Sequence, residues 1–170
     1  MVYDIQDNGC RSYTYISTLG MLMEACIEHN KELIVLDRPN PLGGNKIEGN
    51  VVEYGYYSFV SQFRIPYVYG QTPGELALYL NATDYGNRCN LHVVKMKGWK
   101  RDMTWDETGL EWIVASPHCP QGKSAIFYCV TGIFGEFGYV NIGVGYTLPF
   151  EIMGAPWIDA DSLATALNDL

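Results

Sequence analysis

Charged and amide side chains follow three short apolar runs of this sequence, and side chains of these types could bind a polar ligand. The runs lie at 2–5, 34–36 and 92–97. In an open α/β sheet, ligands bind outside the carboxyl ends of the strands, so polar residues there predict a small-molecule pocket. Seven residues are the candidates for substrate binding: Asp7, Arg11, Asp37, Arg38, Asn40, Lys100 and Arg101. The alternative for each strand exit is a solvated ion pair with no ligand.

The hydrophobic pattern predicts the elements that would position these side chains. Short apolar runs alternate with stretches of helical spacing, which favours an α/β domain, a partial Rossmann-like fold with a mainly parallel sheet flanked by helices. The predicted strands cover 2–5, 33–36, 91–96 and 150–158, and the predicted helices cover 14–29, 73–80, 122–131 and 161–170. The glycine-rich stretch 132–145 is expected to be a loop, with at most a short strand.

Helix-start signals support two of these predictions. Thr72 precedes Pro73, and Glu75 follows three positions after Thr72, which is the pattern of a capping box with proline at the first helical position. Glu75 is therefore interpreted as a capping residue and not as a catalytic acid. Asp161 is expected to cap the last helix, which would end at Leu170.

Composition excludes several classes of function. Hydrophobic residues make up 48% of the 170 residues, enough for a core, and no apolar stretch approaches the length of a membrane span. The formal net charge of −8 argues against nucleic acid as a partner, because nucleic-acid binding favours a basic surface. Aromatic side chains are numerous and mostly expected in the core, with Trp99 as the best candidate for stacking on a sugar.

The cysteines and histidines predict neither a metal site nor a cofactor. Five cysteines are present without a Cys-x-x-Cys pair, and the three histidines lack metal-ligand spacing. Cys26 and Cys129 lie in apolar, helix-like stretches and are expected to be buried thiols. His118 and Cys119 are adjacent, but sequence neighbours seldom have the mutual geometry of a base and a nucleophile.

Four blocks of sequence resemble a known family, and they occur in its order along nearly the whole chain. The blocks are Asp4–Asp7 with Gly9, Arg11 and Tyr13–Tyr15; Leu36–Gly44; Met96–Met103; and Gly154–Asp159. On these residues the chain is identified as a member of the exo-β-N-acetylmuramidases (NamZ-like, also catalogued as domain of unknown function 1343).

The resemblance implies a fold and an activity. Family members have a Rossmann-like domain followed by a smaller α/β domain, and they release N-acetylmuramic acid from the non-reducing end of peptidoglycan fragments. The expected division is 1–158 as the later part of the first domain and 159–170 as a helix leading to an absent C-terminal domain. The family's Gly-Pro-Glu-His-Gly segment, with its proposed catalytic glutamate, is not found, so the chain is expected to be truncated at its N-terminus and inactive alone. The resemblance also implies an extracellular or periplasmic location, although no signal peptide is found.

Within this family, the candidate residues have two possible roles. Glycoside hydrolysis uses a proton donor and a second carboxylate, and Asp4, Asp7 or Asp37 could be the second group. The alternative is structural pairing with Arg11 and Arg38. Either arrangement keeps the aspartates ionised, because nearby cations lower a carboxylate pKa, so they are poor proton donors. Basic side chains suit the lactyl carboxylate of muramic acid, and the candidates are Arg11, Arg38 and Lys100.

Departures from the family leave other functions open. Residues 141–148 lack a glutamate and two arginines that members typically carry, and 68–70 replaces an Arg-His-Gly segment; Glu136 matches a family glutamate. One alternative is a non-catalytic paralogue that binds a glycan or a protein. Another is a chain whose exposed sheet edge is covered by a homo-oligomer, because an unpaired strand edge is an aggregation template.

Overall fold

The computed structural model describes residues 1–170 and contains one parallel sheet. Its strands are β1 (Val2–Tyr3), β2 (Glu32–Leu36) and β3 (Asn90–Val94), which lie side by side in that order. Val2 is in register with Ile34, and Ile34 is in register with His92. The predicted α/β fold is confirmed. The strands at 2–5, 33–36 and 91–96 are also found, with their ends shifted by one or two residues.

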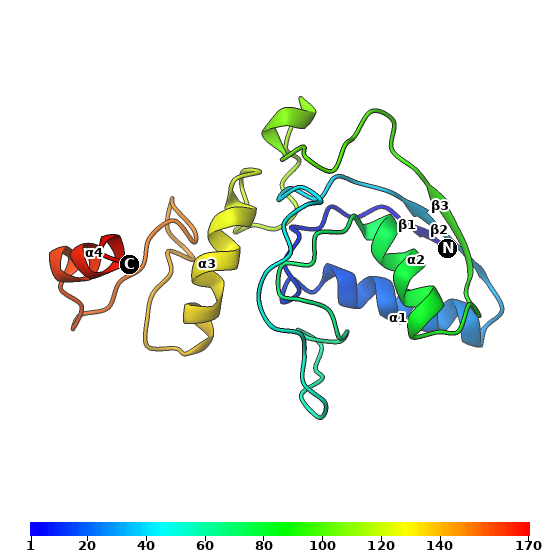
Figure 1. Ribbon diagram of the computed structural model, residues 1–170, viewed down its shortest axis with the longest axis horizontal. Coiled ribbons are helices and arrows are strands. Elements are labelled where there is room, and N and C mark those ends of the chain that lie inside the picture. The colour runs from blue at the N-terminus through cyan, green and yellow to red at the C-terminus, as the bar shows by residue number, and fades with distance from the viewer.

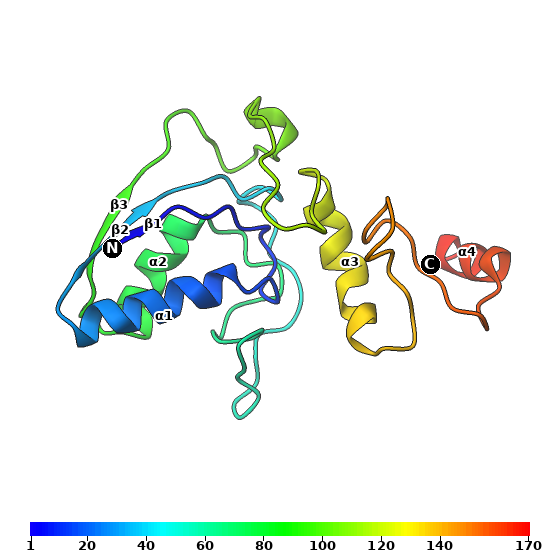
Figure 2. The same cartoon turned by 180° about the vertical axis from the view of Figure 1, so that it is seen from behind.

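Two helices cover one face of this sheet. Helix α1 (Tyr15–Glu28) connects β1 to β2, and helix α2 (Pro73–Thr83) lies between β2 and β3 in the sequence. Both lie on the same side of the strands in the two opposite views (Figures 1 and 2). The predicted capping box is present, because the Thr72 side chain accepts from the backbone of Glu75 while the Glu75 carboxylate accepts from the backbone of Thr72.

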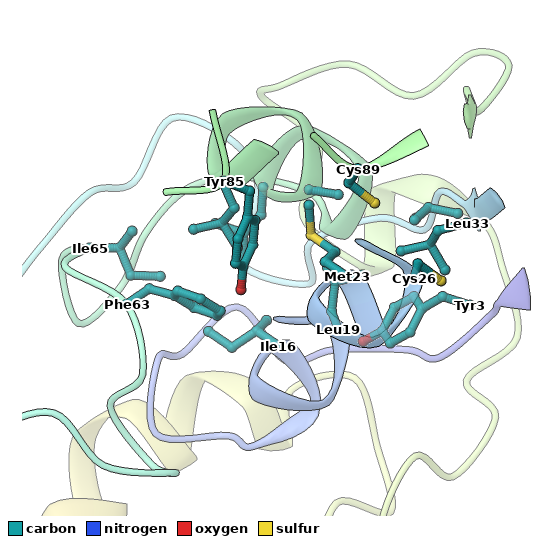
Figure 3. Packing of buried hydrophobic residues seen from close by; sticks show 14 of the residues in the cluster. Tyr3, Ile16, Leu19, Met23, Cys26, Leu33, Phe63, Ile65, Tyr85 and Cys89 are labelled. Atoms are coloured by element: carbon teal, nitrogen blue, oxygen red, sulfur yellow. The ribbon is translucent and has the colours of Figure 1, made fainter. Parts of the chain in front are cut away.

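The core lies between the sheet and these helices. Fifteen buried residues form it, and side chains from α1, β2 and α2 interdigitate there (Figure 3). Leu19 and Met23 are four residues apart on α1 and therefore point to the same side, into the cluster that also contains Leu33. Each fully buried aliphatic side chain contributes about 1.5–3 kcal/mol to stability. This packing holds the strand ends in place.

The second half of the chain differs from the prediction at two helices and one strand. Helix α3 (Ser124–Glu136) continues through Gly132 into the stretch predicted as loop. At Gly135 a side chain would collide with Ile142, since a Cβ would lie 2.5 Å from Ile142 Cδ1. Glycine here thus permits close packing and does not break the helix.

The predicted strand at 150–158 does not form. Phe150 has a φ of 65°, in the left-handed region, and the only pairing nearby is an isolated bridge between Asn141 and Gly154. The last helix, α4 (Ala160–Asn168), begins one residue after Asp159, whose Oδ1 accepts from the backbone of Ser162 at 2.9 Å. The cap is therefore Asp159, and the prediction of Asp161 was wrong.

Helices α3 and α4 extend away from the sheet, so the molecule is elongated, with the two termini towards opposite ends (Figure 1). A short 3-10 helix, η1 (Asp106–Thr108), lies in the segment that connects β3 to α3. None of the helices has both the length and the apolar character needed to span a bilayer.

Candidate functional site

A cavity of about 500 Å³ opens at the carboxyl ends of the three strands. Each strand contributes polar lining residues through the segment that follows it. These residues are Asp4 after β1, Asp37 and Arg38 after β2, and Lys97 and Trp99 after β3. The parallel strands thus bring together side chains that are far apart in the sequence. This is where ligands bind in open α/β sheets.

An ion pair between Asp4 and Arg38 forms one wall of the cavity. Arg38 Nε donates to Asp4 Oδ1 at 2.7 Å, and Arg38 Nη2 lies 2.6 Å from the same oxygen. Both side chains are more than one-third exposed, and such pairs contribute at most about 1 kcal/mol to stability. Both residues also line a neighbouring hollow of about 360 Å³. The pair is therefore accessible from two sides.

Asp37 connects the end of β2 to the start of α2. Its Oδ1 accepts from the backbone of Gly74 at 2.8 Å, and its Oδ2 accepts from Thr72 Oγ1 at 2.9 Å. Burial raises the pKa of Asp37, although these hydrogen bonds act in the opposite direction. A Cβ on Gly74 would lie 2.7 Å from Asp37 Cγ, so glycine is what allows the carboxylate to approach the helix N-terminus. Asp37 therefore holds the cavity wall as well as lining it.

Two predicted site residues form hydrogen bonds to loops near the cavity and do not line the cavity. Asn40 is buried, donates from Nδ2 to Gln71 O at 3.0 Å and accepts at Oδ1 from the backbone of Leu42. Arg101 donates to Glu75 Oε1 and to the carbonyl oxygens of Gly44 and Gly70, each at 2.7 Å. These bonds use the polar atoms that a ligand would need, so both residues act here as structural ties.

Asp7 and Arg11 lie in the loop after β1, away from the cavity. Asp7 is buried and accepts from the backbone of Gly9 at 2.8 Å and from the Tyr69 hydroxyl, while its Oδ1 has no partner. Burial raises the pKa of Asp7 to about 6, against the lowering effect of these hydrogen bonds. Arg11 donates from Nη1 to Asn50 O at 2.7 Å and also to Ile65 O.

After β3, the lysine that lines the cavity is not the one that the sequence suggested. Lys100 is exposed and does not line the cavity, whereas Lys97 does. Trp99 lines it as well, with its ring against Gly44, where a Cβ would lie 3.0 Å from Trp99 Cη2. The aromatic signal at Trp99 was visible in the sequence. Nothing in the sequence distinguished Lys97 from Lys100.

Among His, Cys, Asp and Glu, no group of three or more lies close enough together to hold a metal ion. The polar side chains of the cavity are instead two carboxylates, one guanidinium, one ammonium, one hydroxyl and one indole. Such a mixture suits a polar organic ligand with hydroxyl groups and a negative charge.

Comparison with known families agrees with the resemblance of the sequence blocks. Residues 1–123 match the model of the exo-β-N-acetylmuramidase NamZ N-terminal domain. Residues 126–170 match the model of the C-terminal domain of the same family. The chain belongs to this family. The two matches meet near the start of α3, whereas the division expected from the sequence lies at 158 and stays a prediction.

Individual relatives support the same assignment. The peptidoglycan β-N-acetylmuramidase NamZ of Bacillus subtilis (strain 168) is 45% identical over 170 residues, which is 100% of this chain and 41% of that protein. A crystal structure of a DUF1343 family protein from Bacteroides fragilis NCTC 9343 superposes with a TM-score of 0.92 at 65% identity, covering 99% of this chain and 44% of that one. A second crystal structure of a DUF1343 family protein from the same organism superposes with a TM-score of 0.84 at 34% identity, and the match covers 94% of this chain and 44% of that one. The chain thus spans less than half the length of these relatives.

Proposed function

We propose that this chain forms part of the sugar-binding pocket of an exo-acting β-N-acetylmuramidase that releases N-acetylmuramic acid from peptidoglycan fragments. The observation that carries the proposal is the polar cavity at the strand ends, in a chain 45% identical to a peptidoglycan β-N-acetylmuramidase over its full length. Its position and its mixture of groups fit an acidic sugar.

Arg38 and Lys97 are the proposed partners of the lactyl carboxylate. The ion pair with Asp4 uses Nε and Nη2 of Arg38, so Nη1 is free to donate to a ligand. Lys97 adds a second positive charge to the same cavity, and charge-assisted hydrogen bonds to a carboxylate are the strong ones. Arg11, which the sequence suggested for this role, already donates to two backbone carbonyl groups. Trp99 offers an aromatic surface for the sugar ring.

The carboxylates of the cavity are proposed to bind and orient the sugar and not to donate the proton. Asp4 faces a guanidinium, and Asp37 accepts from Gly74 and Thr72. A general acid must present a protonated oxygen to the leaving group. The Asp4 carboxylate is paired with a guanidinium, and both oxygens of Asp37 already accept hydrogen bonds, so neither is free to donate to the sugar although burial raises the pKa of Asp37. No catalytic residue is assigned, and the fragment is expected to be inactive alone.

Calorimetric titration tests the binding role. N-acetylmuramic acid is expected to bind the chain selectively over N-acetylglucosamine, which lacks the lactyl carboxylate. Arg38→Ala and Lys97→Ala are each expected to weaken binding by about 10-fold or more, the usual cost of losing a charge-assisted hydrogen bond. Lys31→Ala is the matched control, since Lys31 is exposed and distant from the cavity. Equal binding of the two sugars, or unchanged affinity in both variants, would refute the assignment.

Hydrolysis separates this proposal from that of a glycan-binding paralogue. A chromogenic β-N-acetylmuramic acid glycoside is the substrate, tested on the chain joined to a family segment that carries the proposed catalytic glutamate. Release of the chromophore that falls with Arg38→Ala supports the enzyme. Selective binding without any release supports the non-catalytic alternative.

The substrate also suggests a location. Peptidoglycan fragments arise at the cell wall, so we propose an extracellular or periplasmic site of action, as the family resemblance implies. Immunodetection in fractionated cells tests this, and a purely cytosolic signal would contradict it.

A homo-oligomer through the sheet edge is proposed as well. Strand β1 has only two residues and pairs on one side alone, with Met1 and Val2 62% and 60% exposed at the other edge. An open edge of this kind pairs with another chain readily. Light scattering would show a mass above that of one chain, and a stable monomer at high concentration would contradict it.

A further inference from the structure

A cavity of about 400 Å³ lies beside helix α3 and shares no lining residue with the cavity at the strand ends. One of its walls is a face of α3, and the other is formed by residues of the segment 140–150, which lies alongside the helix (Figures 1 and 2). Both walls belong to the part of the chain that matches the C-terminal family model. The proposed sugar site does not use this cavity, which we call the α3 trough.

The face of α3 that lines the trough has large side chains at its two ends and glycines between them. Tyr128, Gly132, Gly135 and Glu136 are spaced by four, three and one residues, which places all four on one side of the helix. At a rise of 1.5 Å per residue, Tyr128 and Glu136 are about 12 Å apart along the helix axis. Cys129 lies off this face and is only partly buried, although the sequence predicted a buried thiol.

Glycine at position 132 is explained neither by the helix nor by packing. Gly132 lies inside α3, where glycine is less favourable than alanine. The nearest neighbours of a Cβ there would be atoms of the Tyr128 ring, at 3.6 Å or more, which is ordinary contact. At Gly135, in contrast, a Cβ would collide with Ile142. A larger side chain at 132 would therefore fill the trough without disturbing the fold.

Hydrogen bonds hold the wall opposite the helix. The backbone N–H of Phe150 donates to Ile142 O at 2.7 Å, and its carbonyl oxygen accepts from Thr131 Oγ1 at 2.8 Å. These bonds keep Phe150 at a φ of 65°, a conformation that persists only where the surroundings impose it and that is frequent at ligand sites. The bridge between Asn141 and Gly154 fixes the start of the same segment. Both walls of the trough are thus preformed.

The lining of the trough is mostly apolar, and its one charge is negative. Five lining residues are hydrophobic, and no basic side chain is among the lining residues. Glu136 is exposed and takes part in none of the four ion pairs of the chain. Lys123, at the start of the same helix, already pairs with Glu151 at 3.0 Å. The Glu136 carboxylate is therefore available to a positively charged ligand.

These features favour an aliphatic chain that ends in an ammonium group. An anion would be repelled by Glu136. A sugar has hydroxyl groups around its ring, whereas the trough offers few polar side chains: Glu136, Asn141, whose Oδ1 accepts from Gly143, and Tyr128, whose hydroxyl accepts from Ser12. Hydroxyl groups buried without partners would weaken binding of a sugar.

From this geometry we propose that the α3 trough binds the lysine side chain of a peptide, with the ammonium group on Glu136. The four-carbon stem of lysine would lie over Gly132 and against the apolar wall that contains Phe150. The stem is shorter than the trough, so the peptide backbone would lie towards Tyr128. This proposal is independent of the sugar site at the strand ends and stands or falls separately from it.

Nuclear magnetic resonance titration of the ¹⁵N-labelled chain tests the proposal, with Nα-acetyl-lysine methylamide as the probe. Saturable shifts are expected at the amides of Gly132, Gly135 and Asn141, and none at the strand-end residues 97–99. The norleucine analogue has the same four carbons without the ammonium group and should bind about 5-fold more weakly, the upper range for an exposed ion pair. Equal affinity for the two probes, or stronger binding of N-acetylglucosamine in the trough, would overturn the proposal.

Two variants separate the charge from the shape of the trough. Glu136→Gln should weaken binding of the lysine probe about 5-fold and leave that of the norleucine probe unchanged. Gly132→Leu should abolish binding of both probes, and helicity should be kept because leucine is a good helix former. Glu53→Gln is the matched control, since Glu53 is exposed and lies outside the trough. Unchanged affinity in Glu136→Gln would refute the proposal even where Gly132→Leu folds poorly, because residue 136 is exposed.

Discussion

The sheet region (residues 1–95) and the α3–α4 region (residues 124–170) are held together by very different amounts of buried apolar surface. The main core has fifteen buried residues, all within the sheet region. The second cluster has four, of which only Ile142 and Phe150 belong to the α3–α4 region, and α4 buries no residue. Since apolar burial is the dominant stabilising term, the sheet region is the rigid frame that carries the cavity.

Truncation of one aliphatic side chain in each region tests this difference most strongly. Leu76 is fully buried in the main core, so Leu76→Ala should lower the free energy of unfolding by about 3 kcal/mol. Ile142 is 8% exposed in the small cluster, which can relax around the gap, so Ile142→Ala should cost only about 1–2 kcal/mol. Urea unfolding measures both. Equal decreases in the free energy of unfolding for the two variants would show that the two regions unfold as one unit with comparable packing.

Asp7 lies in the loop after β1, in the sheet region, and its buried carboxyl makes stability depend on pH. Its ordinary pKa of 3.8 rises to about 6 in the folded protein. The neutral form is therefore favoured by folding, and this contribution is complete below the unfolded pKa. It is lost as pH rises through about 6, at a cost of about 3 kcal/mol.

Two substitutions should change this pH dependence in opposite directions. Asp7→Asn keeps an acceptor for Gly9 but cannot ionise, so its stability relative to the unaltered chain should increase between pH 4 and pH 7. Tyr69→Phe removes a hydrogen bond that lowers the pKa of Asp7, so the decrease in stability caused by ionisation of Asp7 should continue to higher pH. Urea unfolding at a series of pH values measures both. Parallel pH profiles for all three proteins would contradict the assignment to Asp7.

Glycine-to-alanine substitutions should change the stability of the protein in opposite directions in the two regions. A Cβ on Gly74 would lie 2.6 Å from Val93 Cγ1 and 2.7 Å from Asp37 Cγ, so Gly74→Ala should destabilise the protein by about 2 kcal/mol. Gly132 lies inside α3, and its Cβ would be 3.6 Å from Tyr128, an ordinary contact. Gly132→Ala should stabilise by about 0.5–1 kcal/mol through helix propensity. Thermal unfolding distinguishes the signs, and destabilisation by both would show that α3 is packed as tightly as the sheet.

The sequence predicted the sheet region better than the α3–α4 region for the same physical reason. Apolar periodicity and the signals at Thr72 and Glu75 report burial and capping, which are strong in the sheet region. Glycine in α3 was interpreted as a loop signal, whereas Gly135 allows Ile142 to pack against the helix. That contact depends on a neighbour seven residues along the chain, which local patterns do not report.

The candidate site was predicted at the level of the strand ends but not of every side chain. Asp37 and Arg38 line the cavity as expected for residues directly after a strand. Asn40 and Arg101 have the same polar character, yet they bind the carbonyl oxygens of Gln71, Gly44 and Gly70. The path of the loop between β2 and α2 decides which polar groups are satisfied internally, and this path is a tertiary property.

The helix caps also differ between the two regions, and the smallest effect on global stability is expected at the cap of α4. Thr72 is fully buried, accepts from Glu75 and donates to Asp37, so Thr72→Ala should lower the free energy of unfolding by about 1–2 kcal/mol. Asp159 is an exposed cap on a helix without buried residues. Asp159→Ala should therefore speed amide exchange within α4 alone and leave global unfolding unchanged.

Acid should reproduce the loss of the α4 cap. Hydrogen bonds from Ser162 hold the pKa of Asp159 below its usual value, so the cap is present above the unfolded pKa and is lost as pH falls through the folded one. Amide exchange by mass spectrometry, corrected for intrinsic rates, should show α4 losing protection at low pH in the unaltered chain but not in Asp159→Ala. A simultaneous loss of protection in α1 and α2 would show that α4 unfolds together with the sheet region, and the contrast between the two regions would not hold.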